Sequence, residues 1–243
     1  MNLIVDIGNS LIKIAVFQSN SLVEKRILSK ENFLKEFDYF KEKYQLIEKC
    51  IVSSVSNDHL KFLNELKSSY KTLVLDDVTR LPFRNEYATP GSLGKDRIAL
   101  VAAAVDQYPG KNVLVIDAGT CITYDLKTSE ETYLGGAISP GMQLRFKSLH
   151  KFTENLPLVS AKPEPKFIGN STETSILSGI INGIKMELKS TVEWYMSEFE
   201  DLTIIFTGGD HQILSIPLKN SIFANSNFLL EGLNFILEFN KTQ

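Results

Sequence analysis

Two short turns of the same chemical type follow apolar, strand-like runs in different parts of the chain. Residues 3–5 lead into residues 6–10 (DIGNS), and residues 113–116 lead into residues 117–120 (DAGT). A glycine lets backbone N–H groups approach a phosphate closely, a carboxylate can hold a cation, and a hydroxyl can donate to a phosphate oxygen. Because a second alternating apolar run follows each turn, the two turns together predict a duplicated β-hairpin that binds one nucleotide from both sides. This pattern favours an ATP-dependent phosphotransferase.

The order of the expected elements repeats along the chain. Three strands and a helix are expected at 3–6, 11–17, 22–28 and 29–44, and again at 113–116, 122–126, 132–139 and 141–152. Further strands are expected at 50–55, 72–75 and 202–206, and further helices at 58–69, from 96 onward, at 172–199 and at 229–239. The repeat predicts two similar halves, residues 1–111 and 112–243, with a nucleotide cleft between them.

Composition narrows the class of protein. The 243 residues carry 26 basic and 29 acidic side chains, and no segment gathers Lys and Arg among aromatic residues, so nucleic acid is not an expected partner. Nothing approaches the roughly 18 consecutive apolar residues of a membrane span, and we expect no membrane association and a cytoplasmic location. Cys50 and Cys121 show no CxxC spacing and are expected to be reduced core thiols.

A second cluster, residues 94–97 (GKDR), stands where a loop enters a helix. Helix N-termini favour anions, and the simpler interpretation makes Asp96 a helix N-cap, worth about 1 kcal/mol over Ala. A cap requires neither Lys95 nor Arg97 beside it. A carboxylate between two cations is suited to deprotonate an acceptor hydroxyl while Arg97 holds an anionic group.

The carboxylates of the two turns have a simpler interpretation as well. Asp6 and Asp117 could accept backbone N–H bonds within their own turns, the usual role of Asp beside Gly. A third glycine turn at residues 207–210 (TGGD), suited to approach a base or ribose, argues for a shared nucleotide site, and Lys13 adds a charge that pairs with phosphate oxygens. The three histidines show no metal-ligand spacing.

Taken in order, these motifs resemble those of type III pantothenate kinases, a branch of the superfamily that also contains acetate kinases, sugar kinases and actin. The resemblance rests on residues 6–10 with Lys13 and on residues 94–97, 117–120, 135–141, 169–172 and 207–210. The glycine turns alone indicate the superfamily, whereas their order together with Gly-Lys-Asp-Arg is specific to this branch. The resemblance implies an α/β protein with two ribonuclease H-like halves, the actin-like ATPase fold.

The resemblance also implies an activity and a set of site residues. The reaction is ATP-dependent phosphorylation of pantothenate to 4′-phosphopantothenate, the first step of coenzyme A biosynthesis, with Asp96 as the general base. Asp6 would hold Mg²⁺ with ATP, Asp117 would hold a monovalent cation, K⁺ or NH₄⁺, and the protein would be a homodimer. The implied ATP-binding residues are Asp6, Ile7, Gly8, Asn9, Ser10, Leu11, Ile12, Lys13, Thr120, Gly208 and Gly209. The implied pantothenate-binding residues are Tyr87, Gly94, Lys95, Asp96, Arg97 and Thr172, the last in its own or the partner subunit's site.

Two other functions fit part of this pattern. A kinase of the same fold could act on another small hydroxyl or carboxylate substrate, such as a sugar or acetate. A non-catalytic regulator could bind nucleotide alone. The complete acidic set of Asp6, Asp96 and Asp117 argues against a regulator, because a silent relative would be expected to have lost at least one of them.

The helix expected over residues 172–199 bears on assembly. At 3.6-residue spacing one apolar stripe forms, consisting of Ile176, Ile180, Ile184, Leu188 and Val192. Further apolar side chains, Leu177, Ile181 and Trp194, are expected to lie beyond that stripe. Because such surface tends to mark an interface, the pattern predicts a symmetric homodimer through this helix. The alternative is a helix simply buried between layers.

Overall fold

The computed structural model describes residues 1–8, 11–54, 60–214, 221–223 and 226–241, and its internal contacts divide the chain into two compact units. The first unit comprises Met1–Pro109 together with Asn227–Gln243, and the second comprises Gly110–Ser226. The C-terminal segment therefore belongs with the first unit, whereas the repeat in the sequence predicted a second half of residues 112–243.

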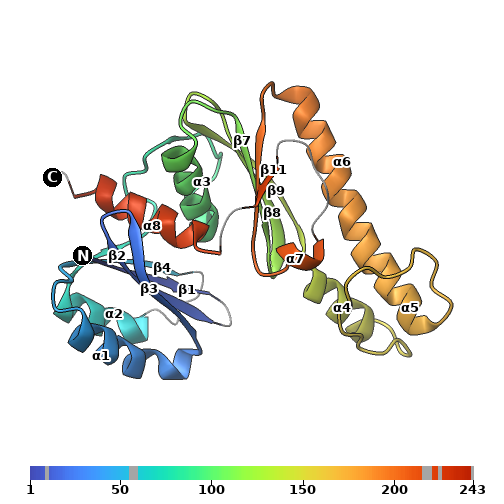
Figure 1. The fold of residues 1–243 in the computed structure, drawn as a ribbon, viewed down its shortest axis with the longest axis horizontal. Coiled ribbons are helices and arrows are strands. Elements are labelled where there is room, and N and C mark those ends of the chain that lie inside the picture. The colour runs from blue at the N-terminus through green and yellow to red at the C-terminus, as the bar shows by residue number, and fades with distance from the viewer. Residues whose placement is uncertain (9–10, 55–59, 215–220, 224–225, 242–243) are drawn as a thin grey trace. The chain divides into compact units, whose positions relative to one another are not determined.

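The first unit is built on a sheet with mixed strand directions (Figure 1). Its strands are β1 (Asn2–Ile7), β2 (Ile12–Gln18), β3 (Ser21–Leu28), β4 (Lys49–Ser54) and β5 (Lys71–Val74), in the order β3-β2-β1-β4-β5. The hairpin strands β1, β2 and β3 pair antiparallel, whereas β4 pairs parallel with both β1 and β5. The central strand β1 therefore has one antiparallel and one parallel neighbour.

Helices cover both faces of this sheet because the strands alternate apolar side chains to either side. One face packs against α1 (Phe33–Lys43) and α2 (Leu60–Ser69), where phenylalanines of α1 join the apolar residues of β1, β2 and β4. On the other face lie α3 (Lys95–Gln107) and α8 (Phe228–Phe239). A Cβ atom at Gly232 of α8 would lie 1.8 Å from the Ala99 carbonyl oxygen, so these two helices are in close contact. The contact with α3 explains why α8 belongs to the first unit.

The first unit also contains shorter elements. They are the 3₁₀ turns η1 (Lys30–Asn32) and η3 (Pro90–Ser92) and the two-residue strand β6 (Arg84–Asn85). The last two lie in the long connection between β5 and α3.

The second unit repeats the strand order of the first. Its strands are β7 (Val113–Ala118), β8 (Cys121–Lys127), β9 (Thr132–Pro140), β10 (Thr203–Thr207) and β11 (Ser221–Phe223), ordered β11-β10-β7-β8-β9 within the unit. Strand β7 pairs antiparallel with β8 and parallel with β10, as β1 does with β2 and β4. The predicted repeat of two similar α/β units is therefore confirmed. Strand β11 and the short helix α7 (His211–Leu214) were not expected.

The helices of the second unit are α4 (Met142–Lys151), α5 (Thr172–Leu177), η4 (Ser178–Asn182) and α6 (Gly183–Glu198). The last three form the long helix expected over 172–199, with a π-helical segment, η4, inside it. The expected apolar stripe of this helix is buried in the core of the unit. Leu177 and Ile181 are buried there too, so the prediction that they add outer surface is wrong. Ile181 lies within the π-helical segment, where the number of residues per turn changes and the apolar positions rotate. Trp194 remains 56% exposed.

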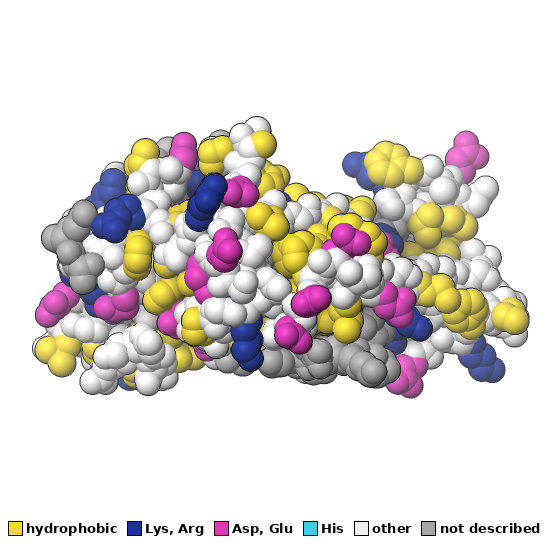
Figure 2. Space-filling view, turned by 90° about the horizontal axis from the view of Figure 1, so that it is seen from above, with side chains coloured by type: hydrophobic (Ala, Val, Ile, Leu, Met, Phe, Trp, Pro, Cys, Tyr) yellow, Lys and Arg dark blue, Asp and Glu magenta, His cyan; other side chains and the backbone are white. Residues whose placement is uncertain are grey.

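On the face of the molecule drawn in Figure 2, the two signs of charge are mixed. Figure 2 shows Lys and Arg side chains interspersed with Asp and Glu over the face in view. In the described part of the chain, no helix combines the length and apolarity needed to cross a bilayer. Both cysteines, Cys50 and Cys121, are free thiols.

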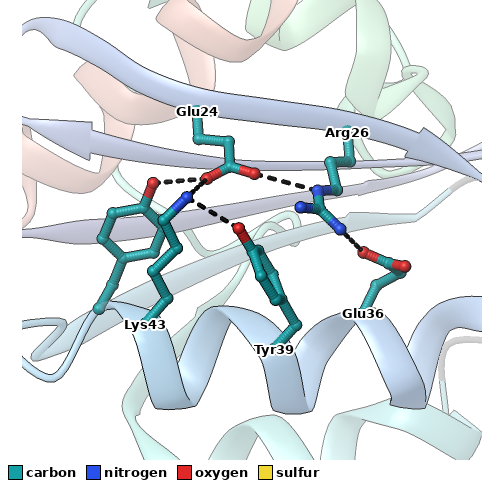
Figure 3. A network of polar contacts seen from close by, with 6 residues as sticks. Glu24, Arg26, Glu36, Tyr39 and Lys43 are labelled. Atoms are coloured by element: carbon teal, nitrogen blue, oxygen red, sulfur yellow. Dashed lines mark hydrogen bonds and ion pairs between the residues drawn. The ribbon is translucent and has the colours of Figure 1, made fainter.

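A polar network ties the edge strand β3 to α1 (Figure 3). Glu24 accepts hydrogen bonds from Arg26 Nε at 3.0 Å, from Lys43 Nζ at 2.7 Å and from the Tyr44 hydroxyl at 2.6 Å. Burial opposes the ionisation of Glu24, but these donors outweigh it and lower its pKa to about 2. The Arg26 guanidinium also lies 3.9 Å from the centre of the Tyr39 ring.

We expect Glu24→Gln to lower the Tm at pH 7 by about 2–4 °C, because weakening this network costs about 1 kcal/mol. Folding lowers the pKa of Glu24 from 4.5 to about 2. Its contribution is therefore complete above pH 4.5 and is lost as the pH falls towards 2. Thermal melts between pH 7 and pH 2 should show the wild type and the variant converging. Glu42→Gln, on the exposed side of α1, is the control, and an unchanged Tm difference at pH 2.5 would contradict the prediction.

Candidate active site

The first turn places a buried carboxylate at the end of the central strand of the first unit. Asp6 of β1 pairs in register with Lys13 of β2 and with Ser53 of β4. Residues paired directly across a ladder project to the same face, so these three side chains are neighbours. The Lys13 ammonium lies 3.5 Å from Asp6 Oδ2. An anion, a cation and a hydroxyl thus meet where β1 and β4 end.

The electrostatics of Asp6 link it to the start of α3. Only 5% of Asp6 is exposed, and this burial raises the pKa of its carboxyl group. The positive charge of Lys13 opposes the increase, whereas the negative charge of Asp96 adds to it. Asp6, Lys13 and Asp96 therefore interact within one unit, although they come from β1, β2 and α3.

The turn after β1 is partly within the described residues. The Gly8 N–H donates to the Leu11 carbonyl oxygen at 3.0 Å, and a Cβ atom at Gly8 would lie 3.0 Å from that same oxygen. Ile7 and Ile12 close the hairpin as partners in the ladder. Two of the expected ATP-binding residues, Asn9 and Ser10, lie outside the described residues.

The Gly-Lys-Asp-Arg cluster forms the start of α3. Gly94 is the N-cap, so the simpler interpretation of Asp96 as the N-cap is wrong by two positions. Asp96 lies in the first turn, where its Oδ1 accepts the backbone N–H of Arg97 at 2.8 Å. A Cβ atom at position 94 would lie 2.5 Å from Asp96 Oδ1, so a larger residue there would displace that carboxylate. The helix N-terminus stabilises the negative charge of Asp96.

Two cations and an aromatic ring surround this turn. Arg97 is buried, and its guanidinium carbon lies 5.6 Å from the centre of the Tyr87 ring. Lys95 Nζ lies 3.7 Å from Asp77 Oδ1. The structure thus brings together Tyr87, Lys95, Asp96 and Arg97, all expected on the substrate side of the site.

The second and third glycine turns meet in the second unit. Asp117 of β7 pairs in register with Thr123 of β8 and Thr207 of β10. Gly208 has φ +101°, and a Cβ atom there would lie 2.3 Å from the Ala118 carbonyl oxygen and 2.5 Å from Asp117 Oδ1. Glycine alone fits this position, because both its conformation and its neighbours exclude a side chain. Residues 207–210 therefore lie directly against the Asp117 turn.

A further glycine, directly after β9, supports the same turn. The Gly141 N–H donates to the Thr120 carbonyl oxygen at 3.1 Å, and a Cβ atom at Gly141 would lie 2.1 Å from the Gly119 carbonyl oxygen. The side chain of Thr120 is exposed, and a Cβ atom at Gly209 would meet no described atom within 4 Å. The backbone of this turn is thus held by its neighbours while Thr120 and Gly209 stay accessible.

Thr172, the remaining expected substrate residue, begins α5. The preceding Ser171 caps the helix by accepting the N–H of Thr174 at 3.2 Å. Thr172 lines a pocket of about 660 Å³ in the second unit together with Arg145, Ser175 and apolar residues of α4 and η4. It is therefore in a different unit from Tyr87 and Arg97.

The sequence motifs did not indicate two residues beside the site, Ser53 and Thr123. Both are buried, and neither hydroxyl has a hydrogen-bond partner among the described residues. Ser53 ends an apolar run at the carboxyl end of a parallel strand, the edge where α/β sheets bind ligands, and that signal could have identified it. The described residues contain no group of three or more His, Cys, Asp or Glu side chains able to hold a metal.

Comparison with solved structures identifies the fold. A conserved Baf family protein from Campylobacter jejuni is 23% identical, with a TM-score of 0.68 over 99% of this chain and 100% of that chain. The activator of the 2-hydroxyisocaproyl-CoA dehydratase from Clostridium difficile, solved with ADPNP bound, is 10% identical, with a TM-score of 0.54 over 100% of this chain and 97% of that chain. These likenesses concern the fold alone, and they confirm the expected actin-like ATPase architecture.

Comparison of sequences is more specific. The family described as type III pantothenate kinase matches residues 2–193. A type III pantothenate kinase of Christiangramia forsetii is 70% identical over 243 residues, covering 100% of both chains. The chain therefore belongs to the type III pantothenate kinase family, and its activity is that of a pantothenate kinase.

Proposed function

We propose that the chain transfers a phosphoryl group from ATP to the hydroxyl of pantothenate, the first step of coenzyme A biosynthesis, with Asp96 as the general base. The observation that carries this assignment is the start of α3, where Asp96 interacts with the buried Asp6 and stands beside Arg97. Phosphoryl transfer depends mainly on positioning and on neutralising charge, and this turn supplies both. Membership of the family supports the choice of substrate.

Asp96 is suited to receive the proton of the acceptor hydroxyl. Its Oδ1 is held by the Arg97 N–H at 2.8 Å, so the carboxylate has a fixed orientation. As the hydroxyl oxygen attacks the terminal phosphorus of ATP, its proton passes to the Asp96 carboxylate and the bond to ADP breaks. Arg97 and Lys95 are the groups we assign to the carboxylate of pantothenate, since guanidinium and ammonium groups both bind carboxylates. Tyr87 would pack against the rest of the substrate.

Asp6 and Lys13 are assigned to the phosphate side of the reaction. A kinase of this family uses a divalent cation with ATP, and Mg²⁺ is ordinarily bound by one or two carboxylates, water and the phosphates. The buried Asp6 fits that requirement, and Mg²⁺ would neutralise charge on the phosphates. Lys13 would contact phosphate oxygens, and Thr120, Gly208 and Gly209 are assigned the remaining ATP contacts of the second unit.

We expect Asp96→Asn to lower kcat by about 10²–10⁴, because the substitution keeps the side-chain size and removes the base. Binding of Mg·ADP, measured by calorimetry, should stay within about twofold of the wild type. Asp106→Asn, near the other end of α3, is the matched control and should leave kcat unchanged. Near wild-type turnover of Asp96→Asn with pantothenate would contradict the assignment.

We also propose a monovalent cation, K⁺ or NH₄⁺, at Asp117. In the first unit the residue opposite the central carboxylate on the antiparallel strand is Lys13, whereas in the second unit it is Thr123. The buried Thr123 hydroxyl, which has no partner among the described groups, is a suitable oxygen ligand for such a cation. A cation bound between Asp117 and Thr123 would add positive charge at the end of β7, as Lys13 does beside Asp6 at the end of β1.

We expect the wild type to need K⁺ for activity and to gain Tm on adding K⁺, because a ligand that binds only the folded protein stabilises it. Asp117→Asn should lose most of that Tm gain, and Thr123→Val should lose part of it. Melts and rates in K⁺, Na⁺ and cation-free buffer would measure this. Equal activity of the wild type in all three buffers would refute the cation proposal.

We propose further that the protein is a homodimer in which α5 brings Thr172 towards Tyr87 and Arg97 of the partner subunit. Thr172 and the pair Tyr87–Arg97 lie in different units of one chain. Met186 and Trp194 remain exposed on α6, and apolar side chains of this size favour an interface. Leu177 and Ile181 give no support, since the core of the unit covers them.

Mixing two inactive variants tests this arrangement. If each site draws Asp96 from one chain and Thr172 from the other, a heterodimer of Asp96→Asn and Thr172→Val chains has one site with both lesions and one with neither. We expect activity to return after subunit exchange, up to about half of the wild-type rate per heterodimer. No recovery after verified exchange, or a fully active monomer by light scattering at micromolar concentration, would contradict it.

A further inference from the structure

The Ser53 hydroxyl is buried and has no hydrogen-bond partner among the described residues. Ser53 is fully buried near the end of β4, and its Oγ finds no acceptor or donor in the described part of the chain. An unsatisfied buried polar group costs about 1–3 kcal/mol, so most folded proteins leave very few of them. Ile51, two residues earlier on the same face of β4, is apolar and fully buried, so the hydroxyl at position 53 interrupts an apolar run.

The position of Ser53 relates this hydroxyl to the reaction. In the parallel ladder between β1 and β4, Ser53 pairs with Asp6, so both side chains lie on the same face at the carboxyl ends of their strands. The hydroxyl is near enough to favour the ionised form of Asp6, yet it makes no hydrogen bond of normal length. Asp6 Oδ2 faces Lys13 on the opposite side.

We infer that Ser53 is a positioning residue for Asp6, donating its hydroxyl hydrogen bond to that carboxylate when Mg·ATP is bound; this inference rests on the proposed role of Asp6. With Lys13 on one side and Ser53 on the other, the plane of the carboxylate is fixed and its remaining lone pairs stay available to Mg·ATP. Residues that orient a metal-binding carboxylate matter for binding, and their loss typically costs 10–100-fold in affinity or activity. In the ligand-free protein, a Ser53 hydroxyl with no partner among the described residues thus lowers stability, and binding of Mg·ATP would give it a role.

Ser53→Ala and Ser53→Cys test the inference together. Alanine removes the hydroxyl, and cysteine nearly keeps the volume but donates weakly, so packing differs between the two while both lack a good donor. Both variants should weaken Mg·ADP binding by about tenfold or more in calorimetry and raise the KM for Mg·ATP similarly. The KM for pantothenate should stay within about twofold. Ser53→Thr, which retains the hydroxyl, should bind Mg·ADP within about threefold of the wild type.

Measurements of Tm distinguish a positioning role of Ser53 from a purely structural one. Because the hydroxyl is unsatisfied without ligand, Ser53→Ala should leave the Tm of the ligand-free protein unchanged or raised. A lower Tm with unchanged Mg·ADP affinity would show a packing role and overturn the inference. Wild-type affinity in Ser53→Cys would overturn it equally. Ser54→Ala, on the adjacent residue whose side chain alternates to the opposite face, is the control and should leave the affinity unchanged.

Asp6→Asn separates failure of this inference from failure of the proposed function. If Asp6→Asn binds Mg·ADP like the wild type, the assigned role of Asp6 is wrong and the role of Ser53 falls with it. If Asp6→Asn weakens binding while Ser53→Ala does not, only the inference about Ser53 is wrong. When Ser53 acts through Asp6, the two substitutions are not additive, and adding Ser53→Ala to Asp6→Asn should change the affinity less than twofold.

Discussion

The site depends on one feature of strand pairing, a central strand with an antiparallel neighbour on one side and a parallel neighbour on the other. This pairing places Asp6 between Lys13 and Ser53, and Asp117 between Thr123 and Thr207. The hairpin supplies one flanking side chain from nearby in the sequence, and the parallel crossover supplies the other from far away. In each unit, the carboxylate at the end of the central strand therefore lies between one side chain that is near it in the sequence and one that is distant.

The two units use this shared framework with different charges. The first unit balances its carboxylate with an internal cation, Lys13, and adds the acidic Asp96 nearby. The second unit offers the hydroxyls of Thr123 and Thr207 around Asp117 and closes the turn with Gly208 and Gly141. The surroundings of the two carboxylates thus differ, with titratable side chains beside Asp6 and with hydroxyls and closely packed glycine backbone beside Asp117. This division fits an enzyme that activates one substrate and holds another.

The sequence predicted features that are local and missed those that depend on distant partners. The turns at Asp6 and Asp117 could be recognised because the carboxylate, the glycine and the preceding strand are adjacent in the chain. Ser53 was missed, because its relation to the site comes from its register with Asp6 across the β1–β4 ladder. Ile181 was misplaced because simple 3.6-residue spacing does not hold through the π-helical segment. The position of α8 was missed for a similar reason, because its contact with Ala99 spans more than half of the chain.

Because α8 packs in the first unit, its late place in the sequence affects how the protein folds during synthesis on the ribosome. Helix α3, which carries Asp96 and Arg97, packs against α8, and the whole second unit lies between them in the sequence. During synthesis the side of α3 that packs against α8 therefore stays uncovered until the second unit has been synthesised. The N-terminal sheet can form early, but the helix that bears the proposed base reaches its finished packing only when the last described helix emerges. Catalytic competence is thereby tied to completion of the chain through α8.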